Sequence, residues 1–294
     1  MEIKKVGVVG CGLMGSGVTQ VAAQSGLDVT VRELDQQLLD QGLGQIKRFL
    51  DGRVAKGKMP AEEGAAVWGR IRGVTTLEGL KDCDLVIEAV TENMDLKRDV
   101  FGTLDQVCPA HTIFASNTSS LSITEMAAFT QRPDRFIGLH FFNPVPLMKL
   151  VEVVKSVRTA PETVEAGMAF ARALGKEPIL AEDSPGFVVN LLLVPYILDA
   201  VRALEKGVAS VEDIDRAMRL GAGYPMGPFK LLDFVGLDTT YYIANIMFDE
   251  FKQPQYAAPT LLKRMVMAGY HGKKSGIGFY DYRVDPPTPT EGLV

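Results

Sequence analysis

The sequence is poor in cysteine and histidine, with three of each among its 294 residues. Cys11, Cys83 and Cys108 lie far apart in the chain and form no C-x-x-C pair, which favours neither a disulfide framework nor a thiolate metal site. We therefore expect three reduced thiols with mainly structural roles. The histidines include no H-E-x-x-H motif, and the sequence predicts no metal cofactor.

Long apolar runs are also missing. The strongest candidate, residues 187–198, is interrupted by Asn190 and Pro195, whereas a membrane-spanning helix needs about 18 or more consecutive apolar residues. Residues 1–5 lead directly into an apolar strand pattern, without the hydrophobic segment and cleavage site of a signal peptide. These absences predict a cytoplasmic protein that has no membrane partner.

An excess of positive charge is missing as well. The chain carries 31 Lys and Arg residues against 36 Asp and Glu residues, a net charge of −5. This balance provides no long-range attraction for phosphate backbones, so nucleic acid is a poor candidate partner. An anionic small molecule would need local positive charge. The length suits two domains, each with its own core.

The beginning of the chain has the pattern of a strand, a glycine turn, a helix and a second strand. The first strand is expected at 6–9, the helix through 18–23 and the second strand at 29–31. This βαβ order predicts an α/β domain of Rossmann type with a parallel sheet over residues 1–182. Further strands, with helices between most of them, are expected at 85–89, 113–115, 136–142 and 150–154.

Two segments depart from this alternation. Residues 34–73 are charged, helical in pattern and too long for a normal crossover, which predicts a projecting helical pair turned near Gly57 to Pro60. At Ser184 and Pro185 the composition changes, because a good N-cap and a favourable first helical residue precede a strongly apolar run. We expect an all-α domain over residues 183–294, with a loose proline-rich tail. Its other helices are predicted after Ser210 and at 228–235, 238–252 and 259–269.

The glycine turn at residues 10–15 has the spacing of a dinucleotide site. Gly10 permits a tight turn, Gly12 lets the backbone approach a pyrophosphate, and Gly15 lets the helix pack closely on the strand. The unpaired N–H groups at the start of the helix would face the phosphates. The predicted cofactor contacts in this turn are Gly10, Gly12, Leu13, Met14 and Gly15.

Glu33 lies at the end of the second strand, where such sites hold the adenosine ribose. Its carboxylate can accept both ribose hydroxyls and would repel a 2′-phosphate, which favours NAD over NADP. Arg32 beside it is either a guanidinium that tolerates the phosphate or an outward surface charge.

His140 is the candidate acid–base residue. Hydride transfer to a nicotinamide requires a proton to leave the substrate hydroxyl, and histidine suits that task. His111 and His271 lie in loop-like segments, whereas His140 lies at the carboxyl end of an apolar strand, the edge where open α/β sheets bind ligands. Glu152, in the next β-branched run, is the partner that we expect for it. Spacing alone leaves open whether the two form a structural ion pair or a catalytic one.

Hydroxyl and amide side chains gather at 116–120, again after an apolar strand. Ser120 or Ser122 suits the N-cap of a following helix, which leaves Asn117 and Ser119 for a ligand. Asn190, within the apolar helix, is either a satisfied core amide or a group that reaches a substrate carbonyl.

Four sequence motifs carry a resemblance to a known family: SNTSSL at 116–121, HFFNPVP at 140–146, DSPGFVVN at 183–190 and GAGYPMGP at 221–228. Together they resemble the short-chain 3-hydroxyacyl-CoA dehydrogenases, including the bacterial 3-hydroxybutyryl-CoA dehydrogenases. The resemblance covers residues 6–282. It implies an enzyme of fatty acid metabolism that uses NAD to oxidise an (S)-3-hydroxyacyl-CoA to the 3-oxoacyl-CoA, and a homodimer formed through the helical domain.

The resemblance also implies roles for single residues. His140 would be the base and Glu152 its orienting partner, while Ser119 and Asn190 would bind the reacting end of the substrate. Further positions match those that hold the cofactor, namely Glu92, Lys97 and Lys274, and Lys56 matches a lysine that contacts coenzyme A.

Two positions depart from the family pattern. Leu191 stands where the family usually has arginine, which we expect to change packing rather than catalysis. Phe49 stands where some relatives offer a serine to coenzyme A. Two alternatives stay open: a related NAD-dependent dehydrogenase of a free hydroxy or sugar acid, and an NAD-binding relative that has lost its chemistry.

Overall fold

The computed structural model describes residues 2–293, which form two compact units, one ending at Ser184 and the other beginning at Pro185. This division lies two residues beyond the boundary expected from the sequence. No helix in the described part of the chain is long and apolar enough to cross a membrane.

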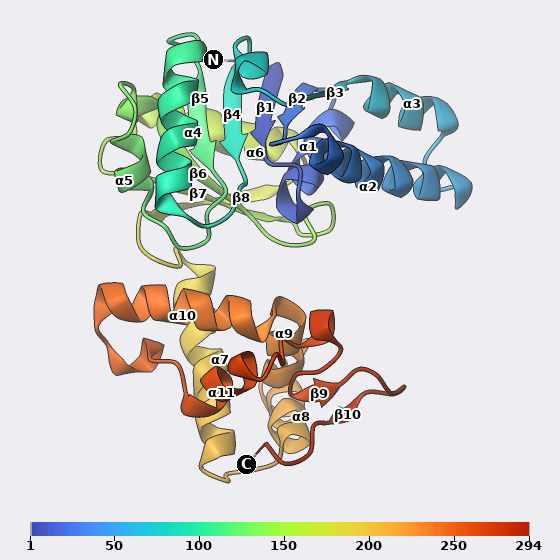
Figure 1. Ribbon diagram of the computed structural model, residues 1–294, viewed down its shortest axis with the longest axis vertical. Helices are drawn as coiled ribbons and strands as arrows, with labels where there is room; N and C mark the ends of the chain where they lie inside the picture. Colours follow the sequence, from blue (N-terminus) through green and yellow to red (C-terminus); the bar gives the residue numbers. More distant parts are fainter. Residues whose placement is uncertain (1, 294) are drawn as a thin grey trace. The chain divides into compact units, whose positions relative to one another are not determined.

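Unit 1 is built on an eight-stranded sheet in the order β3-β2-β1-β4-β5-β6-β7-β8 (Figure 1). All neighbours pair in parallel except β6 and β7, which are antiparallel. The first six positions in this order are those of a dinucleotide-binding fold. The strands are β1 (Lys5–Val9), β2 (Asp28–Arg32), β3 (Ile71–Val74), β4 (Leu85–Glu88), β5 (Ile113–Ser116), β6 (Phe136–Phe141), β7 (Leu150–Lys155) and β8 (Glu177–Glu182).

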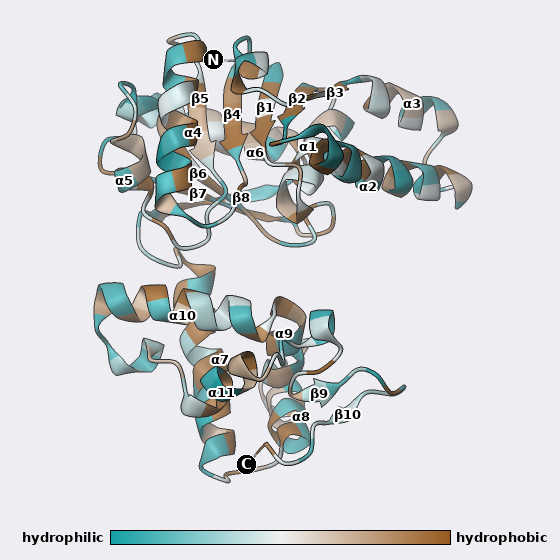
Figure 2. Cartoon of the chain, in the orientation of Figure 1, coloured by the Kyte–Doolittle hydropathy of each residue, from teal (hydrophilic) through white to brown (hydrophobic). Residues whose placement is uncertain are grey.

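The central strands are buried on both faces, which explains why they are nearly continuous apolar runs in the sequence (Figure 2). Side chains of α1 and α6 share one buried cluster with Ile113 and Ala115 of β5. Phe114, between them, points to the opposite face, where its ring lies 6.0 Å from that of Phe101 in α4. The helices of unit 1 are α1 (Leu13–Gln24), α2 (Gln36–Ala55), α3 (Ala61–Gly69), α4 (Met94–Val107), α5 (Ile123–Ala127) and α6 (Pro161–Ala173).

The predicted helical pair is present as α2 and α3, which extend away from the sheet of unit 1 (Figure 1). Asp35 caps α2 by accepting a hydrogen bond from the N–H of Leu38. The two helices are joined at 56–60, the turn indicated by the sequence. Short 3₁₀ turns in the two units lie at Leu77–Leu80, Pro133–Arg135, Pro254–Tyr256 and Lys273–Ser275.

Unit 2 is helical, with its own apolar core. The expectation of an all-α domain needs one correction, because β9 and β10 form a small antiparallel sheet that includes part of the tail predicted to be loose. The elements are α7 (Val189–Glu205), α8 (Val211–Gly221), α9 (Pro228–Val235), α10 (Leu237–Phe251), α11 (Thr260–Met267), β9 (Tyr280–Asp281) and β10 (Thr288–Pro289).

The predicted start of α7 at Ser184 is wrong. Gly186 and Phe187 have φ angles of +81° and +48°, and this left-handed backbone prevents a helix from passing through them. The helix begins at Val189 and continues through Pro195. Asp183, just before the break, instead accepts hydrogen bonds from the N–H groups at the start of α5.

Candidate active site

The glycine turn brings β1 and α1 into close contact. Gly10 has a φ of +97°, and a Cβ on Gly15 would overlap the carbonyl oxygen of Gly10. A Cβ on Gly12 would meet no atom within 4 Å, so the backbone is open there. Since α1 starts at Leu13 without a side-chain cap, its first N–H groups are available to an anion at this open position. The turn therefore fits a pyrophosphate.

Glu33 is fixed beside the same turn. Its carboxylate accepts hydrogen bonds from the N–H of Cys11 at 2.7 Å and from its neighbour Leu34 at 2.8 Å. Such an anchored carboxylate fits the ribose hydroxyls of NAD. Arg32 is half-buried. Burial and then the nearby Glu33 charge raise the pKa of the Cys11 thiol to about 12, which makes this cysteine unreactive.

His140 and Glu152 lie directly opposite each other on the antiparallel strands β6 and β7. The Nδ1 atom of His140 is 2.6 Å from Oε2 of Glu152, and the residues are 6% and 0% exposed. The expected contact is therefore present. A carboxylate at Nδ1 fixes the ring tautomer and orientation, and it directs Nε2 to the opposite side of the ring. The ring of Phe142 lies 4.5 Å away and restricts its tilt.

The other two histidines lie elsewhere. His111 is half-exposed, and its Nε2 is 3.4 Å from a carboxylate oxygen of Asp84. His271 belongs to unit 2, where its ring contacts the carbonyl of Val266. Within residues 2–293 no group of three or more His, Cys, Asp or Glu side chains is arranged to hold a metal ion.

In the polar cluster after β5, the structure confirms one expectation, the helix cap, whereas Asn117 and Ser119 contact other protein groups. Ser122 caps α5 by accepting from the N–H of Glu125. Asn117 accepts from the N–H of Phe141, which ties the loop to the strand that carries His140. The N–H and hydroxyl groups of Ser119 donate to Oε1 of Glu92, at 2.8 and 3.3 Å.

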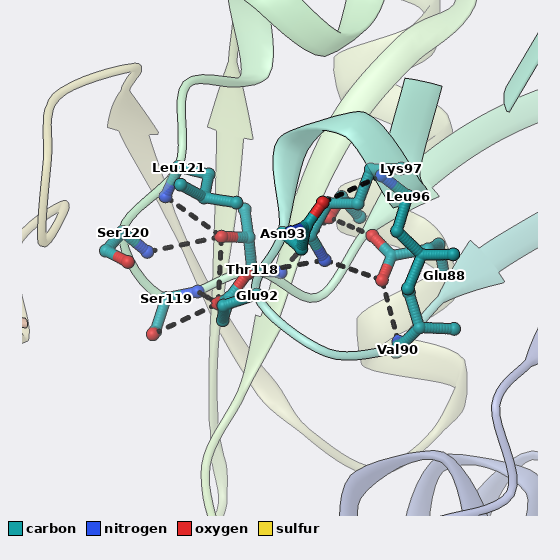
Figure 3. A network of polar contacts seen from close by, with 11 residues as sticks. Glu88, Val90, Glu92, Asn93, Leu96, Lys97, Thr118, Ser119, Ser120 and Leu121 are labelled. Carbon is teal, nitrogen blue, oxygen red and sulfur yellow. Dashed lines mark hydrogen bonds and ion pairs between the residues drawn. The ribbon is translucent and has the colours of Figure 1, made fainter. Parts of the chain in front are cut away.

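Glu88 is a site residue that sequence reasoning missed. It is fully buried at the end of β4, and its Oε1 is 2.6 Å from Nζ of Lys97. The same ammonium is 3.3 Å from Glu92, so the two predicted cofactor residues lie in one charged cluster with Glu88 (Figure 3). The signal was a carboxylate within an apolar run, the same signal that identified Glu152.

These groups share one edge of the sheet. Strand register places Arg32, Val9, Glu88 and Ser116 in one row across β2, β1, β4 and β5. Parallel strands have their carboxyl ends at the same edge, which is where α/β sheets bind ligands. The glycine turn, the Glu88 cluster and the polar loop after β5 therefore all follow the same row.

The other predicted residues belong to other elements of the chain. Lys56 is exposed at the end of α2. Asn190 is the second residue of α7 in unit 2, and Leu191 packs against the core of that unit, which accounts for an apolar side chain in place of the usual arginine. Lys274, also in unit 2, is half-exposed and pairs with Asp238 at 2.6 Å.

Comparison with known proteins identifies the relatives. The family model of the 3-hydroxyacyl-CoA dehydrogenase NAD binding domain matches residues 5–184, and the family model of the 3-hydroxyacyl-CoA dehydrogenase C-terminal domain matches residues 186–282. The probable 3-hydroxybutyryl-CoA dehydrogenase of Bacillus subtilis (strain 168) is 47% identical over 282 residues, which cover 96% of this chain and 98% of that protein. The mitochondrial hydroxyacyl-coenzyme A dehydrogenase of Sus scrofa is 47% identical over 289 residues, covering 96% and 92%.

A solved structure agrees with these relatives. The crystal structure of (S)-3-hydroxybutyryl-CoA dehydrogenase PaaH1 from Ralstonia eutropha has a TM-score of 0.92 and 44% identity, and the match covers 96% of this chain and 99% of that one. The dinucleotide turn, the anchored Glu33 and the family match agree on the cofactor. The chain belongs to the 3-hydroxyacyl-CoA dehydrogenase family and is an NAD-dependent oxidoreductase.

Proposed function

We propose that the chain interconverts a short-chain (S)-3-hydroxyacyl-CoA, such as (S)-3-hydroxybutyryl-CoA, and the corresponding 3-oxoacyl-CoA. The observation that carries this proposal is the buried contact between His140 and Glu152, on strands of the sheet whose edge holds the NAD turn. Two relatives at 47% identity are named as a probable 3-hydroxybutyryl-CoA dehydrogenase and a hydroxyacyl-coenzyme A dehydrogenase, which supports the substrate class.

Residues of the carboxyl edge would hold most of the cofactor. The glycine turn would bind its pyrophosphate, and Glu33 the adenosine ribose. Further residues proposed to hold the cofactor are Glu92, Lys97, Asn117 and Lys274. When bound, NAD supplies the acceptor for the hydride that leaves C3 of the substrate.

The protein itself supplies the group that accepts the proton. In the oxidation, Nε2 of His140 accepts the hydroxyl proton as the C3 hydride departs, so the hydroxyl becomes a carbonyl and the imidazole becomes an imidazolium. The carboxylate of Glu152, 2.6 Å from Nδ1, stabilises that positive charge. Ser119 and Asn190 would hold the reacting oxygen in place.

Lys56 is the candidate residue for coenzyme A, because it matches the lysine that contacts coenzyme A in the family and its side chain is exposed. A groove in unit 1 between α1, α2 and residues 143–147 includes the ring of Phe49. Phe49 therefore offers an apolar surface where some relatives have a serine.

Homodimerisation and cytoplasmic location are further parts of this proposal. Unit 2 exposes large apolar side chains on α7 and α10, such as Leu192 and Tyr242, which is typical of a surface covered by a second copy. The free and buried state of all three cysteines agrees with a reducing compartment.

A spectrophotometric assay tests the function. With NADH, the protein should reduce acetoacetyl-CoA faster than longer 3-oxoacyl-CoAs, and NADPH should be a poor substitute. His140→Gln should lower kcat by roughly 10² to 10⁴, the usual effect of losing a general base, with an almost unchanged Kd for NADH. Near-normal turnover of that variant would refute the role of His140. Equal activity on free acetoacetate would instead select a dehydrogenase of free acids.

A further inference from the structure

Three alternating charges, Glu88, Lys97 and Glu92, lie together at the end of β4 and the start of α4 (Figure 3). The ammonium of Lys97 is 2.6 Å from Glu88 and 3.3 Å from Glu92. The side chains of Lys97 and Glu88 are 1% and 0% exposed, so water does not screen their attraction. Lys97 is thus held more closely by Glu88 than by Glu92.

Glu92 connects these charges to the substrate loop. Its Oε1 accepts from the N–H and hydroxyl of Ser119, and from the hydroxyl of Thr118 at 3.0 Å. Lys97 and Ser119 therefore share one carboxylate. If the ammonium moved closer to Glu92, it would draw that carboxylate away from the hydroxyl of Ser119.

Glu88 is itself firmly placed. Its carboxylate accepts from the N–H of Val90 at 2.7 Å and from the hydroxyl of Ser116 at 2.6 Å, and the strand register sets it beside Ser116. No other carboxylate among the described residues lies within ion-pair distance of Lys97 apart from Glu88 and Glu92. The position of the ammonium between these two carboxylates therefore affects Glu92, which Thr118 and Ser119 also hold.

From this geometry we propose that Glu88 is a positioning residue for the reaction: by retaining Lys97, it leaves Glu92 to orient Ser119 toward the reacting end of the substrate. The inference rests on the proposed function of Ser119. It assigns Glu88 no contact with the substrate.

Glu88→Gln tests the proposal, because the amide keeps the volume and loses the charge that retains Lys97. We expect kcat for acetoacetyl-CoA to fall at least about tenfold at saturating NADH, since small misplacements of orienting groups have effects of this size. In a Ser119→Ala background the same change should lower kcat by less than about twofold, because Glu88 acts on the reaction only through the hydroxyl of Ser119, which this background lacks. An equal loss in both backgrounds would overturn the proposal. So would a loss that saturating NADH abolishes, with the Kd for NADH raised in a fluorescence titration.

Asp105→Asn is the matched control. Asp105 forms an ion pair with Arg132 at 2.7 Å, largely buried, at the far end of α4 from Lys97. Its loss should lower Tm and leave kcat unchanged. If Glu88→Gln does not fold, Glu88→Asp replaces it in the test: it retains the charge with a shorter reach, and we expect kcat to fall by at least about twofold. A wild-type kcat in folded Glu88→Gln, or in Glu88→Asp where Glu88→Gln does not fold, would contradict the inference. Inactivity of the unmodified protein on every acyl-CoA would instead refute the proposed function.

Discussion

At the scale of single residues, the site depends on carboxylates that are buried in apolar strands. Glu152 and Glu88 both have no exposed surface, and each is satisfied by a nitrogen donor at 2.6 Å. A buried carboxylate is stable only with such partners. An acidic residue within a β-branched run was therefore informative in the sequence, even before its partner was known.

Glu152→Gln should lower kcat by about 10- to 100-fold. A hydrogen bond to a charged group contributes about 1.5–3 kcal/mol, and each ~1.4 kcal/mol corresponds to a tenfold change in rate. The glutamine keeps the size of the side chain but no longer stabilises an imidazolium at Nδ1 of His140. Steady-state kinetics with acetoacetyl-CoA would measure the loss, and NADH titration would serve as the control, since its Kd should not move. A normal kcat would mean that the pair is only structural.

The sequence indicated Glu152, but it did not indicate Glu88, although both carry the same local signal. His140 directed attention to Glu152, because a histidine at a strand end has few roles. The partner of Glu88 is Lys97, one turn into α4, and lysines on helices are usually exposed. Only the fold shows that this lysine is buried against the strand end.

At the scale of elements, the sequence predicted the buried strands and missed the edges. The missed strands β3 and β8 are the two ends of the sheet, and both are mostly half-buried or exposed. An edge strand needs fewer apolar residues, so its pattern is weak. The start of α7 was misplaced for a different reason, because the left-handed φ of Phe187 is set by its surroundings and not by its residue type.

The segment between β6 and β7 is anchored by one lysine. Nζ of Lys176 donates to the carbonyl oxygens of Val145 and Met148, at 2.5 and 2.8 Å, and burial lowers the pKa of this side chain. Lys176→Met should lower stability by about 1–3 kcal/mol, because both carbonyls lose their donor. Denaturant unfolding would measure the change, and amide hydrogen exchange at 143–149 should accelerate.

Lys149→Met is the control for that segment. The side chain of Lys149 is 79% exposed and lies 3.8 Å from Glu177. Such an exposed ion pair contributes little to stability. Its replacement should leave both stability and exchange unchanged. Similar results for the two methionine variants would show that Lys176 does not anchor the segment.

At the scale of the whole molecule, the two units differ in where their buried polar groups lie. Unit 1 buries a sheet whose polar groups collect at one edge, whereas unit 2 buries helices around Asp215 and Asp233. Asp215 accepts from the N–H groups that begin α9 and from the hydroxyl of Tyr280. Asp233 accepts from the N–H groups of Phe279 and Tyr280. These carboxylates hold the C-terminal segment against the helices, and their titration should affect unit 2 alone.

Asp233 gives this arrangement a testable pH dependence. Burial raises the pKa of its carboxyl from 3.8 to about 6, although backbone hydrogen bonds oppose the shift. The folded state therefore holds the proton more tightly, and the stabilisation is complete below pH ~4 and is lost as the pH rises through ~6. A difference of about two pKa units corresponds to roughly 3 kcal/mol. Asp233→Asn should be less stable at every pH, because its NH₂ group faces a backbone donor, but its stability should decline less between pH 4 and 6. Denaturant unfolding followed by circular dichroism at several pH values measures how the free energy of unfolding of each protein depends on pH. Asp249→Asn, at an exposed position, is the control. Equal pH dependence in wild type and Asp233→Asn would show that Asp233 does not titrate in this range.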